Sequence, residues 1–378
     1  MISLATFGNE LYTGERSYPI VQRRKWWFII AIAAMVLSGL IVGIKGLNPG
    51  IEFRGGTEFT ISKTSVHTGD AARDVLAKNG VSEPPRVSTV GTDTVRIQTE
   101  NIPVPEGKTS GEMLRTVSDE LAAAYGVADN DVTSSSVGPS WGADVSKKAL
   151  QGLVTFMVLV TIVMAAYFRA WRMGLAAILA LIHDVIVTIG LYALVGFEVT
   201  PASVIGLLTI LGYSLYDTVV VFDKVRENTE GLFEQYQVTY EDQANLAVNQ
   251  TLVRSINTSI VGILPVGSIL FVGAFLLGAG TLRDIALALF IGMIISTLSS
   301  IFLATPLEVV FRNGEARIKE HTRRVQIERG EIDPEEATVP VSRPKSSAAA
   351  KVDTSTDVVE PGQHLGTRHQ PRKKKGRR

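Results

Sequence analysis

The sequence predicts a polytopic α-helical membrane protein with six transmembrane helices and one α+β domain between the first two of them. Two observations lead to this prediction. Hydrophobic residues make up 46% of the 378 residues and gather in long blocks. These blocks have the length of about 20 residues that a helix needs to cross a bilayer. One long hydrophilic stretch, residues 48–146, separates the first block from the second.

Charge and cysteine content narrow the class further. The net charge is zero, but residues 48–146 carry 8 Lys and Arg against 14 Asp and Glu, whereas residues 341–378 carry 10 against 3. The chain has no cysteine, which excludes disulfides, thiol catalysis and cysteine-based metal sites. The first apolar block is too long for a signal peptide and lacks a small-residue cleavage site, so we expect it to stay in the membrane.

The N-terminal residues 1–25 are polar and end in three basic residues, which two tryptophans follow. Basic residues beside an apolar block mark the cytoplasmic side, and tryptophan favours the membrane interface. Residues 26–47 are therefore predicted to be the first transmembrane helix, running outward. Within it, Gly39 and Gly43 either allow a second helix to pack closely or are merely tolerated in the membrane.

Residues 48–146 are predicted to form an extracytoplasmic α+β domain. Its expected strands cover residues 57–63, 86–90, 94–99 and 131–137, and its expected helices cover residues 69–79 and 109–126. The resulting order, β-α-β-β-α-β, is the ferredoxin-like, split βαβ pattern. Thr109 and Glu112 form a capping box that begins the second helix. Because the domain has neither a histidine cluster nor a Gly-rich phosphate loop, we expect a mechanical or protein-binding role.

Residues 147–311 contain the other five predicted transmembrane helices. These cover residues 149–168, 173–195, 202–222, 255–277 and 285–305. The Lys and Arg bias of the connections predicts that both termini are cytoplasmic. Residues 240–254 are amphipathic and are predicted to form a separate helix along the inner membrane surface, and Pro306 is expected to end the last helix.

Residues 312–378 are predicted to be a cytoplasmic, largely disordered basic tail. The segment after Phe311 is charged and suits a helix up to residue 336. From Pro340 onward the chain is rich in Ser, Pro and Ala and cannot bury enough apolar surface to fold. Two interpretations remain for this tail: a solvated segment beside anionic lipid or the ribosome, or a specific regulatory or nucleic-acid-binding segment.

The most unusual feature of the apolar blocks is Asp217. It is the only residue between Glu198 and Asp223 that carries a formal charge at neutral pH. A carboxylate at that depth costs about 2.5–3.5 kcal/mol to insert, so we expect it to be paired, hydrated or functional. Its expected partner is Arg254 at the start of the next transmembrane helix, with Asn257 close by.

Hydroxyl groups surround Asp217 in the sequence. The supporting polar side chains are Tyr213, Ser214, Tyr216 and Thr218. Burial disfavours an ionised carboxylate, whereas hydrogen bonds and a nearby cation favour it. Two interpretations remain: a proton relay in which protonation of Asp217 weakens its pair with Arg254, or a fixed ion pair that only joins two helices. His183 and Asp184 are either relay members or form a packing hydrogen bond.

Several motifs of this sequence resemble the SecD/SecF family of translocon accessory proteins in the RND superfamily. Residues 50–57, GIEFRGGT, are similar to the family motif G-I-D-F-x-G-G-T. Residues 210–228 resemble the signature I-G-Y-S-x-N-D-T-[VI]-V-V-F-D-R-[IV]-R-E-N of its SecF branch, and residues 249–259 resemble N-x-T-L-x-R-T-x-x-T-S. His183 and Asp184 match the H-D pair of the family.

The resemblance implies an RND half in the bacterial cytoplasmic membrane, with SecD as its partner. It also implies the task, which is protein export through the SecYEG translocon, driven by the proton motive force, with an unfolded translocating polypeptide as cargo. In the family, the signature Asp and the Arg of the following motif act in proton transport, and they fall here on Asp217 and Arg254. Protons are the coupling ion, and neither a cofactor nor a metal is implied.

The first motif is expected to be the hinge between the first helix and the outer domain. The residues of this hinge are Gly50, Glu52, Phe53, Gly55 and Gly56. The sequence departs from the family pattern in three places. Glu52 replaces an Asp in the hinge, Tyr216 replaces the Asn beside the signature Asp, and the tail after Phe311 has no family counterpart.

Three other functions fit parts of the sequence. An intramembrane aspartyl protease would use Asp184 and Asp217 as two carboxylates that share a proton, but no G-x-G-D precedes Asp184, so we expect no enzyme activity. A small-molecule RND exporter normally has two six-helix halves in one chain, and this chain has one. A scaffold for the translocon without proton coupling is the third alternative.

Overall fold

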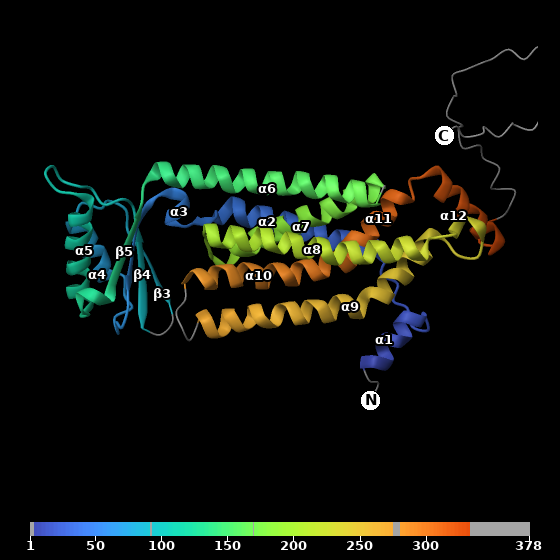
Figure 1. The fold of residues 1–378 in the computed structure, drawn as a ribbon, viewed down its shortest axis with the longest axis horizontal. Helices are drawn as coiled ribbons and strands as arrows, with labels where there is room; N and C mark the ends of the chain where they lie inside the picture. The colour runs from blue at the N-terminus through green and yellow to red at the C-terminus, as the bar shows by residue number, and fades with distance from the viewer. Residues whose placement is uncertain (1–3, 91–92, 169, 275–279, 333–378) are drawn as a thin grey trace, which may run out of the picture. The chain divides into compact units, whose positions relative to one another are not determined.

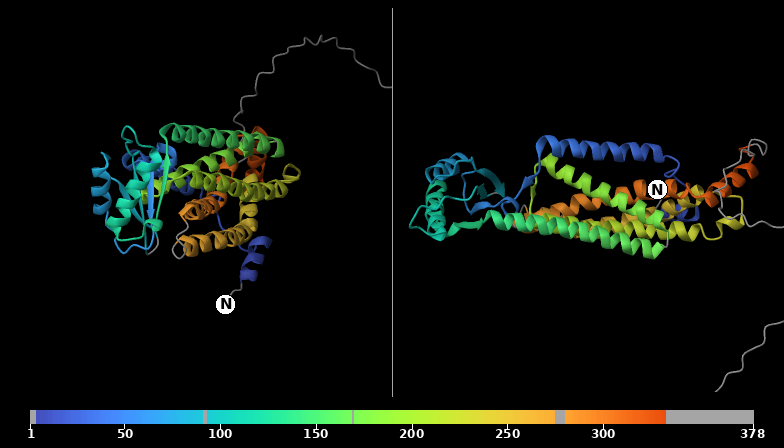
Figure 2. Two further views of the ribbon diagram at one scale, coloured as in Figure 1. Left: turned by 60° about the vertical axis from the view of Figure 1, so that its left-hand side comes forward. Right: turned by 90° about the horizontal axis from the view of Figure 1, so that it is seen from above.

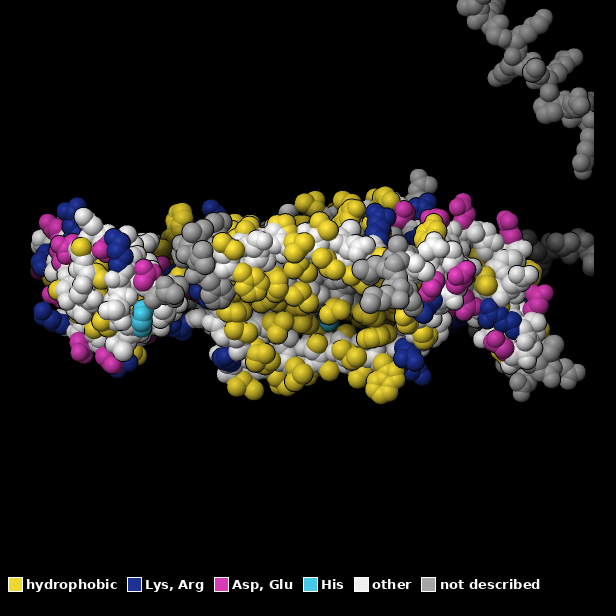
Figure 3. All heavy atoms as spheres, turned by 90° about the horizontal axis from the view of Figure 1, so that it is seen from below, with side chains coloured by type: hydrophobic (Ala, Val, Ile, Leu, Met, Phe, Trp, Pro, Cys, Tyr) yellow, Lys and Arg dark blue, Asp and Glu magenta, His cyan; other side chains and the backbone are white. Residues whose placement is uncertain are grey.

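A computed structural model describes residues 4–90, 93–168, 170–274 and 280–332. In this part of the chain, six helices are long and apolar enough to cross a membrane, as predicted. They are α2 (Arg24–Lys45), α6 (Pro139–Phe168), α7 (Trp171–Val195), α8 (Pro201–Asn228), α9 (Tyr240–Ser268) and α10 (Gly280–Ser299). The six helices pack into one bundle (Figures 1 and 2). Hydrophobic side chains cover the middle of the face drawn in Figure 3, as a multi-pass membrane protein requires.

A four-stranded antiparallel sheet follows α2. Its elements are β2 (Gly56–Ile61), α4 (Asp70–Lys78), β3 (Arg86–Val90), β4 (Thr94–Thr99), α5 (Ser110–Tyr125) and β5 (Val132–Val137). The strand order is β3-β4-β2-β5, and α4 and α5 pack on one face of the sheet around Phe59 and Ile97. The predicted order of elements is confirmed, as is the capping box of Thr109 and Glu112. We call β2 to β5 the sheet domain.

A short parallel pair of strands connects the sheet domain to the bundle. β1 (Asn48–Pro49) pairs with β6 (Glu198–Val199), which lies in the turn between α7 and α8. The amide of Gly50 extends the pair by donating to the carbonyl of Val199 at 2.9 Å. A one-turn helix, α3 (Ile51–Arg54), follows and packs against the start of α6 (Figure 1). We call this end of the bundle the sheet end.

Two predicted helix boundaries at the ends of the bundle are wrong. α6 begins at Pro139 rather than at residue 149, because its first turns pack on α3. An added Cβ at Gly142 would lie 2.7 Å from the carbonyl oxygen of Phe53, so that contact needs a glycine. Pro306 does not end the last helix, because it lies in the first turn of a new helix, α11 (Thr305–Arg312), where a missing amide is tolerated.

The predicted surface helix at residues 240–254 is not separate. It is the first half of α9, which continues to Ser268 and then into a π-helical segment, η3 (Ile269–Ala274). No glycine or proline interrupts the sequence near residue 254, and the first half is packed into the protein rather than laid on a membrane surface. It contacts the N-terminal helix α1 (Leu4–Thr13).

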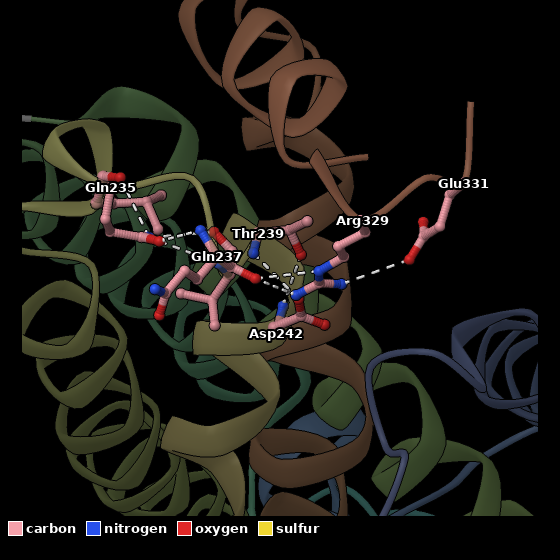
Figure 4. A network of polar contacts seen from close by, with 8 residues as sticks. Gln235, Gln237, Thr239, Asp242, Arg329 and Glu331 are labelled. Carbon is pink, nitrogen blue, oxygen red and sulfur yellow. Dashed lines mark hydrogen bonds and ion pairs between the residues drawn. The ribbon is translucent and has the colours of Figure 1, made fainter. Parts of the chain in front are cut away.

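The end of the bundle opposite the sheet carries an ordered helix after α11. α12 (Ala316–Glu328) buries Ile318, His321 and Val325, so the helix predicted after Phe311 is confirmed and the described part of the predicted tail is folded. Arg329 holds α12 to the connection between α8 and α9, donating to the Gln237 carbonyl at 2.7 Å and pairing with Asp242 at 2.8 Å (Figure 4). Residues 333–378 lie outside the described residues, so the predictions for them remain predictions.

Close helix packing involves Gly190 of α7 rather than Gly39 or Gly43 of α2. An added Cβ at Gly190 would overlap the side chain of Ser38 in α2, whereas no atom lies within 4 Å of such a Cβ at Gly39 or Gly43. Within the described residues of this chain, no helix packs closely against either of the two α2 glycines.

Gly190→Ala should lower the free energy of unfolding relative to Gly39→Ala by about 1–3 kcal/mol, the usual range for overpacking. Both substitutions replace a helical glycine with alanine, so the intrinsic gain in helix propensity cancels between them. Thermal unfolding of the purified full chain in detergent measures the difference. Equal unfolding midpoints for the two variants would contradict the packing described here.

Candidate functional site

Asp217 is buried in the centre of the bundle and is held by two serine hydroxyls. Its side chain lies on α8 and is 5% exposed. Ser255 of α9 donates to Oδ1 at 2.7 Å, and Ser300 donates to Oδ2. Both serines are fully buried. Hydrogen bonds to a carboxylate are among the stronger ones in proteins, so this arrangement joins three transmembrane segments.

Ser300 lies at a break in the helical ladder. It is the first residue of η4 (Ser300–Ala304), a π-helical segment between α10 and α11. Its hydroxyl has a second acceptor, the carbonyl of Thr297 at 3.1 Å. Single π-helical turns occur frequently at functional sites. Ser300 can therefore direct its hydrogen either to Asp217 or to the backbone.

A second buried carboxylate lies on the neighbouring helix. Asp184 of α7 is 1% exposed, accepts a hydrogen bond from Ser214 of α8 at 2.7 Å, and lies 3.1 Å from Nδ1 of His183. Ser214 and Asp217 are three residues apart on α8, so they lie on one side of the helix. The structure thus brings both predicted carboxylates and His183 to adjacent positions around α8.

Arg254 does not pair with Asp217 in this structure. Its side chain is exposed, and it makes no ion pair or side-chain hydrogen bond within the described residues. The adjacent residue, Ser255, occupies the position that faces Asp217. Neighbouring residues on a helix point about 100° apart, so the two side chains cannot face α8 together. The expected ion pair is replaced here by a hydrogen bond to Ser255.

The other predicted supporting residues divide into two groups. The Tyr213 hydroxyl donates to the Thr258 carbonyl on α9 at 2.8 Å, and Thr218 is buried. Tyr216 is 55% exposed and Asn257 is also exposed, so neither contributes to the buried cluster. The replacement of the family Asn by Tyr216 therefore places an aromatic ring on the outside of the bundle rather than beside the Asp217 carboxylate.

The predicted hinge is a tightly packed junction. Gly56 has a φ of +139°, and an added Cβ there would lie 2.5 Å from the carbonyl oxygen of Thr99. Gly55 has a φ of +78°, which also favours glycine. An added Cβ at Gly50 would lie 2.8 Å from Oε1 of Glu198. Phe53 faces the start of α6, where its carbonyl oxygen lies against Gly142.

Charged side chains reinforce this junction, and sequence analysis did not find them. Arg96 of β4 pairs with Glu58 of β2 at 2.7 Å and with Glu198 of β6 at 3.1 Å. Gln98 donates to Glu58 at 2.8 Å and to Glu198 at 2.5 Å. Burial opposes the charge of Arg96, but Glu198 and Glu58 outweigh it and raise its pKa. One carboxylate of the bundle is thereby tied to the sheet domain.

Glu52 lies beside this cluster with an unsatisfied oxygen. Its Oε2 is buried and has no hydrogen-bond partner among the described residues. Burial raises the pKa of Glu52, and the nearby Glu198 and Glu58 carboxylates raise it further. Replacement of the family Asp by the longer Glu52 thus brings a carboxylate into an already acidic junction. In the described part of the chain, no three His, Asp or Glu side chains gather as metal ligands would.

The family of the chain follows from comparison with known proteins. Residues 117–314 match the family described as protein export membrane protein SecD/SecF, C-terminal, and residues 41–62 match the SecD/SecF GG motif. The protein translocase subunit SecF of Streptomyces coelicolor is 41% identical over 375 residues, which cover 98% of this chain and 96% of that protein. The chain belongs to the SecD/SecF family. The predicted resemblance is confirmed, and this is a SecF-type subunit of the protein translocase.

Larger SecDF proteins contain the same fold. The protein translocase subunit SecDF of Thermus thermophilus is 32% identical over 290 residues, which cover 75% of this chain but 37% of that protein. The crystal structure of SecDF from the same organism, titled a translocon-associated membrane protein, matches with a TM-score of 0.68 and 28% identity over 79% of this chain and 39% of that one. The SecF-type chain therefore corresponds to less than half of a SecDF protein.

Glu52→Gln should raise the unfolding temperature at neutral and alkaline pH. The native state holds the Glu52 proton more tightly than the unfolded state does, so ionisation of Glu52 destabilises the native state as the pH rises. The gain over wild type should shrink as the pH falls through the raised pKa and vanish below the ordinary value of 4.5. The measurement is thermal unfolding of the full chain at a series of pH values from about 4 to about 8.

The control for this experiment is Glu106→Gln, because Glu106 is an exposed carboxylate of the sheet domain, away from the junction that contains Glu52. It should leave the pH dependence of unfolding as in wild type. A pH-independent effect of Glu52→Gln would show that the buried carboxylate is not ionised differently in the two states.

Proposed function

We propose that this chain forms a complex with SecD that uses the proton motive force to assist protein export through the SecYEG translocon, and that Asp217 is the group whose protonation is coupled to movement. The observation that carries the proposal is the buried Asp217, bonded by serines from two other membrane segments. An ionisable residue inside a membrane bundle is costly and is typical of proton relays.

Ser300 provides a way to accommodate the proton. When Asp217 is ionised, the Ser300 hydroxyl donates to it. When Asp217 binds a proton, its own O–H donates to the Ser300 oxygen, and Ser300 turns its hydrogen to the Thr297 carbonyl, which already lies within 3.1 Å. A hydroxyl can act as donor and acceptor at once, so both states keep their hydrogen bonds while the orientation of the hydrogen at η4 reverses.

Asp184, His183 and Arg254 have supporting roles in this proposal. Asp184 and His183 lie on the same side of α8 as Asp217, where Ser214 donates to Asp184, and can exchange a proton with the site through Ser214. Arg254 stabilises ionised Asp217 in a second state, which a rotation of α9 by about 100° would produce. This rotation would place Arg254 instead of Ser255 next to Asp217, so proton uptake and helix movement are linked in one step.

The junction at the sheet end carries this movement to the sheet domain. β6 leads directly into α8, and it is held to β1 and, through Glu198, to Arg96 of the sheet. A shift of α8 therefore acts on the sheet domain through a backbone pair and an ion pair. In the proposal the sheet domain is a ferredoxin-like extracytoplasmic domain that holds or releases the emerging unfolded polypeptide, and this prevents it from sliding back.

Orientation and partners follow from charge and from the relatives. The basic residues Arg23, Arg24 and Lys25 lie at the end of the first span opposite the sheet, which favours cytoplasmic termini in the bacterial cytoplasmic membrane. The SecDF of Thermus thermophilus is a single, longer chain, and this chain matches 37% of it. This supports a separate SecD protein that corresponds to the remaining part of SecDF. The crystal structure of that protein is titled a translocon-associated membrane protein, which supports the SecYEG translocon as a second partner. The proposal involves no enzyme activity and no cofactor other than the transported proton.

Asp217→Asn should reduce export to the level measured without a proton motive force, because the amide cannot exchange a proton. Assembly with SecD should be retained, since the amide oxygen still accepts a hydrogen bond from one serine and the amide nitrogen can donate to the hydroxyl oxygen of the other. The measurement is export of a preprotein into vesicles with and without an imposed proton motive force, together with co-purification of SecD.

Asp223→Asn is the matched control, because Asp223 is an exposed carboxylate on the same helix. It should export as wild type. Wild-type export by Asp217→Asn at an unchanged proton motive force would instead support a scaffold without proton coupling.

A further inference from the structure

A buried carboxylate that the proposed mechanism does not use lies at the end of the bundle opposite the sheet, where Figure 1 labels α11. Glu308 of α11 is fully buried. Its Oε1 accepts a hydrogen bond from the Tyr240 hydroxyl of α9 at 2.5 Å, whereas its Oε2 is buried and has no partner among the described residues. The bond to Tyr240 needs a single acceptor, and a buried acceptor left unpaired is costly. A structural hydrogen bond alone therefore does not explain a carboxylate at this position.

Thr305 lies between Glu308 and the Asp217 cluster on the same segment. It is fully buried, and its hydroxyl has no partner in the part of the chain that the structure describes. A π-helical hydrogen bond joins residues five apart, which places Thr305 one turn after Ser300. Residues three apart on an α-helix are neighbours on its surface, which places Glu308 beside Thr305. The three polar side chains therefore follow one another along one side of the segment.

The path from Asp217 to Glu308 is too long for a direct proton transfer. Ser300, which bonds to Asp217, is eight residues from Glu308, and eight helical residues extend about 12 Å. A hydrogen bond joins heavy atoms only about 3 Å apart, so the transfer needs an intermediate group. Between Ser300 and Glu308, Thr305 is the one residue with a polar side chain.

The α8 side of this path is apolar. Val221 and Val225 follow Asp217 along α8 at steps of four residues, so they lie on the same side of the helix. Both pack in one apolar cluster with Tyr240 and Ile301. A proton that moves from Asp217 toward this end of the bundle therefore meets apolar side chains on α8 and polar ones on the segment that carries Thr305.

Charged side chains connect Glu308 to the surface. Within the described residues, the charged groups that act on it are Arg312 and Glu315. Arg312 lies over the Tyr240 ring, 5.2 Å from its centroid, and pairs with Glu315 at 3.2 Å. Arg172 of α7 lies 3.7 Å from the same carboxylate, whose side chain is 34% exposed. A nearby cation makes the ionised form of a buried carboxyl group accessible, so Glu308 can release a proton toward Glu315 and the solvent.

We propose that Glu308 is a further proton-binding residue of this chain, and that it receives through Thr305 the proton that Asp217 releases. The O–H bond of neutral Asp217 breaks and an O–H bond of Glu308 forms. The Thr305 hydroxyl, joined to both by hydrogen-bonded water, takes up one proton and passes on its own. Asp217 is left as the carboxylate to which Ser300 donates. This inference rests on the proposed function, because the proton must first bind to Asp217.

The test measures proton flux through the full chain assembled with SecD in vesicles, under an imposed pH gradient and with a pH-sensitive dye inside. Glu308→Gln keeps an acceptor for Tyr240 but binds no proton. It should lower the flux about a hundredfold, the lower end of the usual contribution of a proton-transferring side chain. Glu328→Gln is the control, because Glu328 is an exposed carboxylate at the same end of the molecule, and it should keep the wild-type flux.

Thr305→Val separates a relay from a structural role. It keeps the shape of the side chain and removes a hydroxyl without a described partner, so the unfolding temperature should not fall. The flux should nevertheless fall as it does in Glu308→Gln. Thr99→Val is the matched control, because Thr99 of the sheet domain is also buried and its hydroxyl also lacks a described partner. This control should keep the wild-type flux.

The outcomes distinguish this inference from the proposed function. Wild-type flux in Glu308→Gln or in Thr305→Val, together with lost flux in Asp217→Asn, would overturn the inference and leave the proposed function standing. Wild-type flux in Asp217→Asn would overturn both. Lost flux in all three variants, with both controls at the wild-type level, is the expected result.

Discussion

The two hydrogen bonds that Ser255 and Ser300 donate to Asp217 are the interaction on which the rest of the bundle depends. A buried carboxylate without partners would be strongly destabilising, so α8, α9 and the segment after α10 must meet at this point. α8 and α10 approach closely enough because small residues line their contact. An added Cβ at Gly206 would lie 2.9 Å from the Cβ of Ala288, and such small residues are typical of close helix packing in membranes.

α8 connects the two parts of the molecule to which the proposal assigns a function. It is one continuous helix of 28 residues, with the junction to β6 at its first residue and Asp217 in its second half. A helix transmits displacement along its length because each turn is hydrogen-bonded to the next. The charged contacts of Glu198 with Arg96 and the pairing of β1 with β6 hold the sheet domain to the start of α8.

Sequence reasoning predicted the spans, the order of the sheet elements and the two buried carboxylates, because hydrophobic length, strand alternation and isolated charge are local properties. It failed where contacts between helices determine the position of a residue. The exposure of Arg254 depends on the rotation of α9 about its axis. Pro306 is tolerated because the π-helical turn before it shifts the register of the backbone hydrogen bonds. Ser255 lies in the motif at residues 249–259, whereas Ser300 lies outside the motifs described above. Both are polar residues within apolar helical segments, which was the signal that could have identified them. The partnership of Arg96 and Glu198, 102 positions apart in the chain, leaves no local pattern.

The central claim is that Asp217 changes its protonation state while it stays buried. Infrared difference spectroscopy of the full chain in vesicles, recorded as the pH is lowered, detects the carbonyl stretch of a neutral carboxyl group. Wild type should gain the bands of several carboxyl groups, one of which Asp217→Asn should lack and Asp223→Asn should keep. Identical difference spectra for wild type and Asp217→Asn would contradict the account, because the proton would then bind elsewhere.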